Sequence, residues 1–358
     1  MSTAPDATDL AAVGGWRELL GRLTAGGDLT GTEAGLAMGE ILAGRATDAQ
    51  IAAFIVALRM KGETAVEVSG MVDAMLAAAA PITLPEGPDP IDIVGTGGAP
   101  SRRAHALNVS TMASLVAAGA GARVVKHGNR RASSTSGSAD LLEALGVVLE
   151  LDGVGVARCV AESGVGFCFA RTFHPAMRHA GPVRAELGVP TVFNYLGPLS
   201  NPAHVQRQVI GVSDPRVGPT VVGVLVERAA PLALVVTGHD GTDELTTTGP
   251  STVHEVRGGE VTTRTVDPAD VGLAVASPDA VAGGAPAENA AIAHRVLGGE
   301  PGPHADIVVL NAAAGLVVAG VADDLADGVT RARSAIESGA AAGVLERLVS
   351  ASQAAAGG

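Results

Sequence analysis

The sequence predicts an α/β protein in which an N-terminal helical domain precedes a larger α/β domain with a mostly parallel central sheet covered by helices. Three capping-box patterns mark the first part of the chain, and from residue 91 onward short β-branched runs alternate with alanine-rich helical runs. Such alternation is typical of a parallel sheet, because parallel strands are joined by helical crossovers. A proline-rich stretch at 81–90 separates the two patterns, so we expect domains at 1–88 and 89–358.

The first helix is indicated by apolar residues at helical spacing, and the next three by their N-terminal caps. The apolar residues are Trp16, Leu19, Leu20 and Leu23, and the capping pairs are Thr30 with Glu33, Thr47 with Gln50 and Thr64 with Glu67. In each pair, two side chains satisfy backbone N–H groups that the start of a helix leaves without partners. Each pair therefore predicts where one helix of the first domain begins.

In the second domain, buried strands are predicted at 91–94, 124–125, 165–169, 209–212 and 232–236, and helices at 110–118, 139–145, 156–162, 217–228 and 288–297. Two further segments, 253–256 and 261–264, are joined across Gly258 and Gly259 and predict an antiparallel hairpin at the edge of the sheet. Ligands of such sheets bind beyond the carboxyl ends of the strands. Polar residues that follow a strand are therefore the candidate functional residues.

Composition argues against several classes of function. The 358 residues carry a formal net charge of -13, which disfavours a nucleic-acid partner but permits a local basic pocket for a small anion. Residues 1–15 lack the basic and apolar regions of a signal peptide, and no apolar run reaches membrane-spanning length. Cys159 and Cys168 are too few for a disulfide framework or a zinc site. We expect a cytoplasmic protein with neither nucleic-acid nor membrane partners.

Five groups of glycine or polar residues stand at strand ends or helix starts. The first, Gly95-Thr96-Gly97-Gly98, directly follows the strand at 91–94. Its glycines let the backbone approach a ligand, and its amides can hold an anion. It matches neither the dinucleotide fingerprint nor the P-loop, and a simple tight turn explains it about equally well.

The second group, Asn108-Val109-Ser110-Thr111, opens a predicted helix. Asn108 or Ser110 suits the N-cap, which is the usual role of these residue types at that place. A helix N-terminus also favours a phosphate group, and the two roles are compatible.

The third group, Lys126-His127-Gly128-Asn129-Arg130, follows the strand at 124–125 and precedes a serine-rich stretch at 133–140. A cation, an imidazole, an amide and several hydroxyls meet at one strand end. This concentration of polar groups favours a functional site over a solvated loop.

The fourth group runs from His174 through Arg184 to Pro202 and includes Pro198, and the fifth is Asp243-Glu244 after the strand at 232–236. Arg184 is either an exposed helix charge or a bidentate donor for a carboxylate. The two adjacent carboxylates either face the solvent or hold a magnesium ion, which typically takes one or two carboxylates and bridges substrate phosphates.

Together and in this order, the five groups resemble the anthranilate phosphoribosyltransferases, and the similarity runs through almost the whole chain. The long segments 126–140 and 174–202 are its most specific parts. The resemblance implies transfer of phosphoribosyl from phosphoribosyl pyrophosphate (PRPP) to anthranilate, with release of pyrophosphate, in tryptophan biosynthesis. It further implies Mg²⁺ as cofactor, a homodimer formed through the helical domain, and completion of that domain by helices around 172–190.

The same resemblance implies roles for individual residues. PRPP would contact or lie beside Gly95, Gly98, Asn108, Ser110, Thr111, Lys126 and Ser138; anthranilate would contact Asn129 and Arg184, with His127, His174 and Pro198 along its path; and Asp243, Glu244 and Ser110 would serve Mg²⁺. Lys126 would offset the charge of the departing pyrophosphate, and His127 is the candidate for accepting the proton of the amine. Displacement at the anomeric carbon is expected to pass through an oxocarbenium-like transition state.

The sequence departs from the family pattern between residues 99 and 107. Ala99 stands where the family has aspartate, Ala106 where it has threonine, and the segment is longer than usual. Two side-chain contacts to PRPP are therefore missing. Arg102 and Arg103 either compensate by pairing with the pyrophosphate or face the solvent.

Three alternative functions stay open at this stage. The first is a paralogue that acts on another aromatic amine, and the second is an enzyme like the pyrimidine nucleoside phosphorylases. The third is a non-catalytic relative that binds PRPP or nucleic acid. The acidic balance of the chain and the Asp243-Glu244 pair argue against the third.

Overall fold

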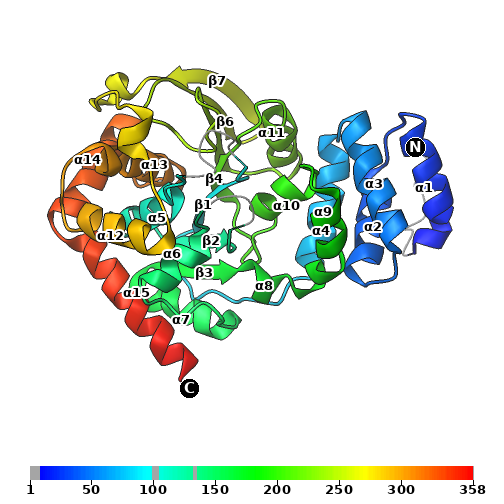
Figure 1. The fold of residues 1–358 in the computed structure, drawn as a ribbon, viewed down its shortest axis with the longest axis horizontal. Helices are drawn as coiled ribbons and strands as arrows, with labels where there is room; N and C mark the ends of the chain where they lie inside the picture. The colour runs from blue at the N-terminus through cyan, green and yellow to red at the C-terminus, as the bar shows by residue number, and fades with distance from the viewer. Residues whose placement is uncertain (1–8, 99–104, 132–134, 358) are drawn as a thin grey trace.

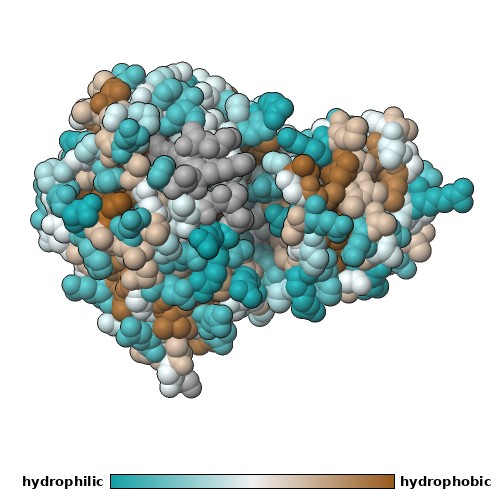
Figure 2. All heavy atoms as spheres, viewed as in Figure 1, coloured by the Kyte–Doolittle hydropathy of each residue, from teal (hydrophilic) through white to brown (hydrophobic). Residues whose placement is uncertain are grey.

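The structure is a computed structural model that describes residues 9–98, 105–131 and 135–357. An α/β part built around a central sheet adjoins a helical bundle that contains the N-terminal helices (Figure 1). The space-filling view shows a narrow waist between these two parts (Figure 2). None of the helices in the described ranges is long and apolar enough to cross a membrane.

The bundle contains α1 (Gly15–Thr24), α2 (Gly31–Leu42), α3 (Asp48–Lys61) and α4 (Ala65–Ala77). The later helices are α5 (Val109–Gly119), α6 (Ser138–Ala144), α7 (Gly153–Ser163), α8 (Ala170–Phe173), α9 (Gly181–Leu187), α10 (Phe193–Leu199), α11 (Gly218–Glu227), α12 (Pro286–Leu297), α13 (Pro303–Ala319), α14 (Leu325–Glu337) and α15 (Ala340–Ala356). Short 3-10 helices lie at η1 (Leu10–Val13), η3 (Pro175–His179), η4 (Pro268–Val271) and η5 (Pro278–Val281).

All three predicted capping boxes are confirmed. Both capping glutamates, Glu33 and Glu67, also contact a neighbouring helix. Glu33 accepts hydrogen bonds from Arg22 of α1 at 2.8 and 2.9 Å, and Glu67 accepts one from Lys61 of α3 at 2.9 Å. A buried carboxylate needs such partners, so each box also ties neighbouring helices of the bundle together.

Within the described residues the strands form one seven-stranded sheet in the order β3-β2-β1-β4-β5-β6-β7. The strands are β1 (Ile91–Gly95), β2 (Val124–Gly128), β3 (Val165–Phe169), β4 (Arg207–Gly211), β5 (Leu232–Gly238), β6 (Ser251–Arg257) and β7 (Glu260–Val266). β1 to β5 are parallel, and β6 and β7 form the predicted antiparallel hairpin at the edge. The strand order reverses between β1 and β4, where ligands of such sheets bind.

Buried apolar residues form two clusters that alternate along the strands. Ile93 belongs to the cluster under α5, α7 and α12 to α15, whereas Val94 belongs to the cluster shared with α1 to α4 and α9 to α11. Successive strand residues point to opposite faces, which explains the division. The core of the helical bundle is therefore continuous with the core on one face of the sheet.

One boundary predicted from the sequence is wrong in a way that affects the site. The sequence places Lys126 and His127 after a strand at 124–125, but they belong to β2, paired with Phe167 and Cys168 of β3. Both side chains are nearly buried, with 3% and 4% of their surface exposed. Charged and polar residues are unusual inside a buried parallel strand, and the partners described below explain why they are tolerated.

Candidate active site

Two adjoining cavities are built from the residues around the carboxyl ends of the parallel strands. One, of about 310 Å³, is lined mainly by glycine, serine, threonine and charged residues, and we call it the polar cavity. The other, of about 640 Å³, has methionine, leucine, proline and phenylalanine in its wall beside histidine and arginine, and we call it the wide cavity. They share the lining residues Val94, Gly95, His127, Gly128 and Asn129. Ligands in the two cavities would meet at this junction.

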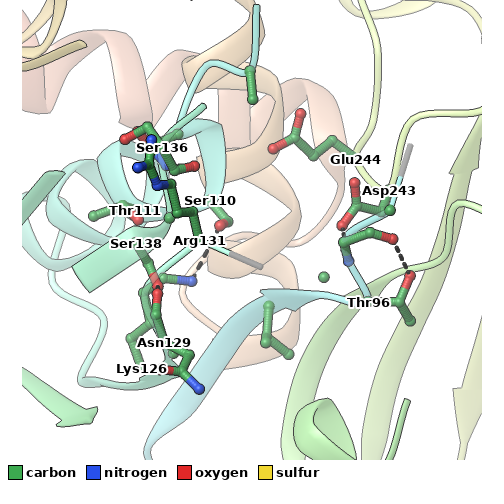
Figure 3. A pocket seen from close by; sticks show the side chains of 18 of the residues that line it. Thr96, Ser110, Thr111, Lys126, Asn129, Arg131, Ser136, Ser138, Asp243 and Glu244 are labelled. Carbon is green, nitrogen blue, oxygen red and sulfur yellow. Dashed lines mark hydrogen bonds between the residues drawn. The ribbon is translucent and has the colours of Figure 1, made fainter. Parts of the chain in front are cut away.

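The glycine loop and Asp243 form one end of the polar cavity (Figure 3). Gly97 and Gly98 have φ values of 68° and 85°, a region that glycine adopts without strain. The backbone N–H of Gly97 donates to Oδ2 of Asp243 at 2.8 Å. A Cβ atom on Gly95 would overlap the same carboxylate oxygen. Glycine at position 95 therefore lets the carboxylate lie against the loop.

Asn108 occupies the N-cap position of α5, but its side chain makes no capping hydrogen bond. Its Nδ2 donates to the carbonyl of Ser136 at 3.1 Å, while its Oδ1 accepts from Oγ of Ser136 and from Nδ2 of Asn289, each at 2.8 Å. The expectation of a side-chain cap is therefore wrong for Asn108, because these stronger tertiary partners take its amide. The first-turn N–H groups of α5 are left without that cap beside the cavity.

Lys126 lies on the floor of the polar cavity. Its Nζ donates to the carbonyl oxygen of Ile93 and to Oγ of Ser110, the latter at 3.1 Å. Burial lowers the pKa of Lys126, while nearby carboxylates act in the opposite direction. An ammonium group has three N–H donors, so one remains to meet a ligand in the cavity.

His127 stands at the junction of the two cavities. Its Nδ1 lies 2.9 Å from the carbonyl oxygen of Gly197, and since a carbonyl only accepts, Nδ1 carries the proton. Its Nε2 is buried without a hydrogen-bond partner among the described residues. Burial, the nearby His174 and Lys126 lower the pKa of His127 to about 3. His127 is thus a neutral imidazole whose buried Nε2 has an acceptor capacity that no described residue uses.

The wide cavity carries Arg184, His174 and Pro198 in its wall. The guanidinium carbon of Arg184 lies 5.0 Å from the ring centroid of Phe193, and within the described ranges no carboxylate pairs with it. His174 is held through Nε2, 2.9 Å from the carbonyl oxygen of Ser200. The fork of Arg184 therefore stays available to a ligand carboxylate beside an aromatic surface.

Each described residue to which the family resemblance implied a role lines at least one cavity. The polar cavity takes Gly95, Gly98, Asn108, Ser110, Thr111, Lys126, His127, Asn129, Ser138, Asp243 and Glu244, and the wide cavity takes Gly95, His127, Asn129, His174, Arg184 and Pro198. Ala106 also lines the polar cavity. The expectations for Ala99, Arg102 and Arg103 lie outside the described residues.

Three polar residues at or behind the polar cavity were not singled out from the sequence. Arg131 and Asn194 line the cavity, and Asn289 anchors Asn108 from α12. An arginine directly before the serine-rich stretch was a signal for Arg131. No local sequence signal points to Asn289, since its partner Asn108 lies 181 residues away in the chain.

Models of two domain families match the chain. The helical bundle domain of the glycosyl transferase family matches residues 17–79, and the a/b domain of the same family matches residues 87–342. The fold and the paired cavities therefore define a two-domain glycosyl transferase.

Individual relatives narrow this class. Anthranilate phosphoribosyltransferase of a Nocardioides species is 55% identical over 341 residues, which cover 94% of this chain and 98% of that protein. The crystal structure of the Thermus thermophilus enzyme has 46% identity and a TM-score of 0.87, covering 94% of this chain and 99% of that one. The Saccharomyces cerevisiae enzyme in complex with PRPP and Mg has 28% identity and a TM-score of 0.85, covering 95% and 98%. The chain belongs to the anthranilate phosphoribosyltransferase family, as its motifs indicated.

Proposed function

We propose that the protein transfers the phosphoribosyl group of PRPP to the amine of anthranilate and releases pyrophosphate, a step of tryptophan biosynthesis. One observation carries this proposal: a cavity rich in phosphate-binding groups adjoins a wide cavity with an available arginine, at a shared junction. PRPP in the first and anthranilate in the second would bring the anomeric carbon and the amine nitrogen together. Holding two reactants in contact supplies a large part of catalysis.

The groups of each cavity match one of the two substrates. The start of α5, Lys126 and Ser138 offer N–H and O–H donors to the phosphates of PRPP. In the glycine loop, the N–H groups of Thr96 and Gly97 already donate to Gly211 and Asp243, so the loop contributes mainly its close approach to the cavity. Arg184 offers two parallel donors to the carboxylate of anthranilate, and Phe193 offers an apolar surface to its ring. Asn129, which lines both cavities, lies where the two substrates would touch.

The donor set of the polar cavity fits Mg²⁺. Asp243, Glu244 and the hydroxyl of Ser110 are hard oxygen donors that line one cavity, and magnesium prefers such donors together with substrate phosphates. The described residues hold no group of three or more His, Cys, Asp or Glu side chains suited to a metal, so we propose that phosphate oxygens complete the coordination. Bound there, Mg²⁺ would neutralise charge on the pyrophosphate leaving group.

In the reaction, the lone pair of the amine forms a bond to the anomeric carbon while the bond from that carbon to the pyrophosphate oxygen breaks. The electron pair of the broken bond leaves with pyrophosphate, and Lys126 stabilises the charge that develops there. His127 is the candidate for accepting the amine proton at Nε2, which a shift of the buried ring would have to expose to the amine. Because the pKa of His127 is lowered to about 3, its protonated form readily passes the proton on to water and returns to the neutral state.

The proposal is tested by following the fluorescence of anthranilate with purified protein, PRPP and magnesium. The expected result is a loss of signal that requires all three, with pyrophosphate released in equal amount. No loss with PRPP, together with phosphorolysis of a pyrimidine nucleoside, would assign the chain to the phosphorylase alternative. Loss of signal with a different aromatic amine but not with anthranilate would assign it to the paralogue alternative.

We also propose that the chain forms a homodimer through its helical bundle. Met60 on α3 is 84% exposed and Val66 on α4 is 45% exposed, and apolar side chains gather over the bundle (Figure 2). Sedimentation should give the mass of two chains for the native protein and of one for Met60→Glu; a native monomer would contradict the assembly. The division into domains at residue 88 and the cytoplasmic location remain predictions.

A further inference from the structure

Three cationic side chains line the polar cavity within the described ranges: Lys126, Arg130 and Arg131. The first two have partners in the protein. Lys126 is held as described above, and Arg130 pairs with Glu143 at 2.7 and 2.9 Å and with Asp140 at 3.3 Å. The charge of Arg130 is therefore compensated before any ligand binds, whereas Lys126 is hydrogen-bonded but keeps one donor for a ligand.

The guanidinium of Arg131 differs from both. It makes no ion pair with a described residue, and its hydrogen bond to the carbonyl of Thr135 is long, at 3.5 Å. Asp140 accepts the backbone N–H groups of Arg131 and Gly137 on Oδ2, each at 2.9 Å, and pairs with Arg130 through Oδ1, but it forms no ion pair with the guanidinium of Arg131. The backbone of Arg131 is thus fixed while its charge is left for a ligand.

The position of Arg131 indicates which ligand group it would meet. Figure 3 shows Arg131 on the same side of the cavity as Ser110, Ser136 and Ser138, across from Asp243. Hydroxyls beside an arginine are typical of a phosphate site, since guanidinium and phosphate form short, charge-assisted pairs.

We propose that Arg131 is a substrate-binding residue that pairs with a phosphate group of PRPP. This inference rests on the proposed function and deepens it. Ala106, in the same cavity, offers no polar side chain, so Arg131 supplies a phosphate contact from a different loop. The inference does not depend on residues outside the described ranges.

The test compares Arg131→Ala and Arg131→Lys with Arg158→Ala as the matched control. Arg158 lies on α7, pairs with Glu162 at 2.7 Å and lines neither cavity, so its removal changes the net charge equally. Arg131→Ala should raise the KM for PRPP about tenfold or more, as expected for a lost charge-assisted contact. The KM for anthranilate should stay unchanged. Arg131→Lys should recover part of the affinity because lysine keeps the charge but not the fork.

Calorimetric titrations with ribose 5-phosphate and with magnesium pyrophosphate identify the phosphate. Weaker binding of either ligand to Arg131→Ala supports the inference and shows which end of PRPP is held. An unchanged KM for PRPP in an active enzyme, or an equal rise in both KM values, would overturn it. If the native protein makes no product, the proposed function fails, while the titrations still decide whether Arg131 binds phosphate.

Discussion

Replacement of Gly95 by alanine tests how the end of β1 builds the site. A Cβ atom at this position would lie 3.0 Å from Cγ of Asp243 and would overlap its Oδ2. The carboxylate must retreat by about 1 Å, and a misplacement of that size costs on the order of 100-fold in rate. We therefore expect Gly95→Ala to lower kcat about 100-fold.

The stability of the same variant should change little. The overlapping atom ends a side chain that can rotate, and the backbone oxygen of Asp243, 3.2 Å from the added Cβ, has to give by only a few tenths of an ångström. Gly211→Ala is the contrasting case, because its Cβ would overlap the backbone carbonyl of Asp243 and should destabilise the fold by about 1–3 kcal/mol. Gly39→Ala, with no atom within 4 Å of the added Cβ, is the control without overlap; because Gly39 lies inside α2, it should keep the activity and raise the stability by about 0.5–1 kcal/mol. The assays are the initial rate of anthranilate consumption and denaturant unfolding.

A double-mutant cycle decides whether Gly95→Ala acts through Asp243. If it does, the rate penalty of Gly95→Ala should largely vanish in an Asp243→Ala background, since the displaced group is already gone. Equal penalties in both backgrounds, or native activity in Gly95→Ala, would refute the reasoning.

Three other predictions use the same assays. Asp243→Ala combined with Glu244→Ala should keep the fold but lower activity by at least about 100-fold and flatten the magnesium dependence; an active double variant with an unchanged magnesium profile would exclude the pair as the metal site. Arg184→Ala should raise the KM for anthranilate about tenfold or more with little effect on PRPP, and Arg184→Lys should not restore it; equal effects on both substrates would make the arginine structural. The pKa of His127 is lowered from 6.5 to about 3, so between these values the unfolded chain binds more protons at this residue than the native one, and stability falls as the pH falls. His127→Gln should therefore reduce the loss of stability between pH 6.5 and 4.5, by up to about 1.4 kcal/mol per pH unit, and an unchanged acid profile in denaturant unfolding would contradict the shift.

The elements of the fold could be predicted because their signals are local. Thr30 and Glu33 cap the N-terminus of the helix that they begin. Gly258 and Gly259 join two strands that pair directly with each other. The C-terminal boundary of β2 was harder to predict from the sequence. Lys126 looked like a loop residue because a buried cation needs partners, and those partners come from β1 and α5.

Most of the site could be anticipated as a set of chemical groups. Glycines, hydroxyls, a lysine and two carboxylates at strand ends indicate a phosphate and metal site whatever their exact arrangement. The acceptor role of His127 was less certain from the sequence, because the proton position and the lowered pKa depend on Gly197 and on burial. Arg131 stands out only when the ion pairs of Arg130 are known.

The sequence by itself determined where the capped helices α2 to α4 begin, which side chains could carry chemistry, and to which family the chain belongs, because caps and motifs are properties of neighbouring residues. Tertiary structure alone decided that the two cavities share a wall at His127 and that Asn289 of α12 holds Asn108 in place. It also decided that Asp243 reaches the glycine loop. These contacts join residues far apart in the chain, so they exist only once the packing of sheet and helices brings the strand ends together.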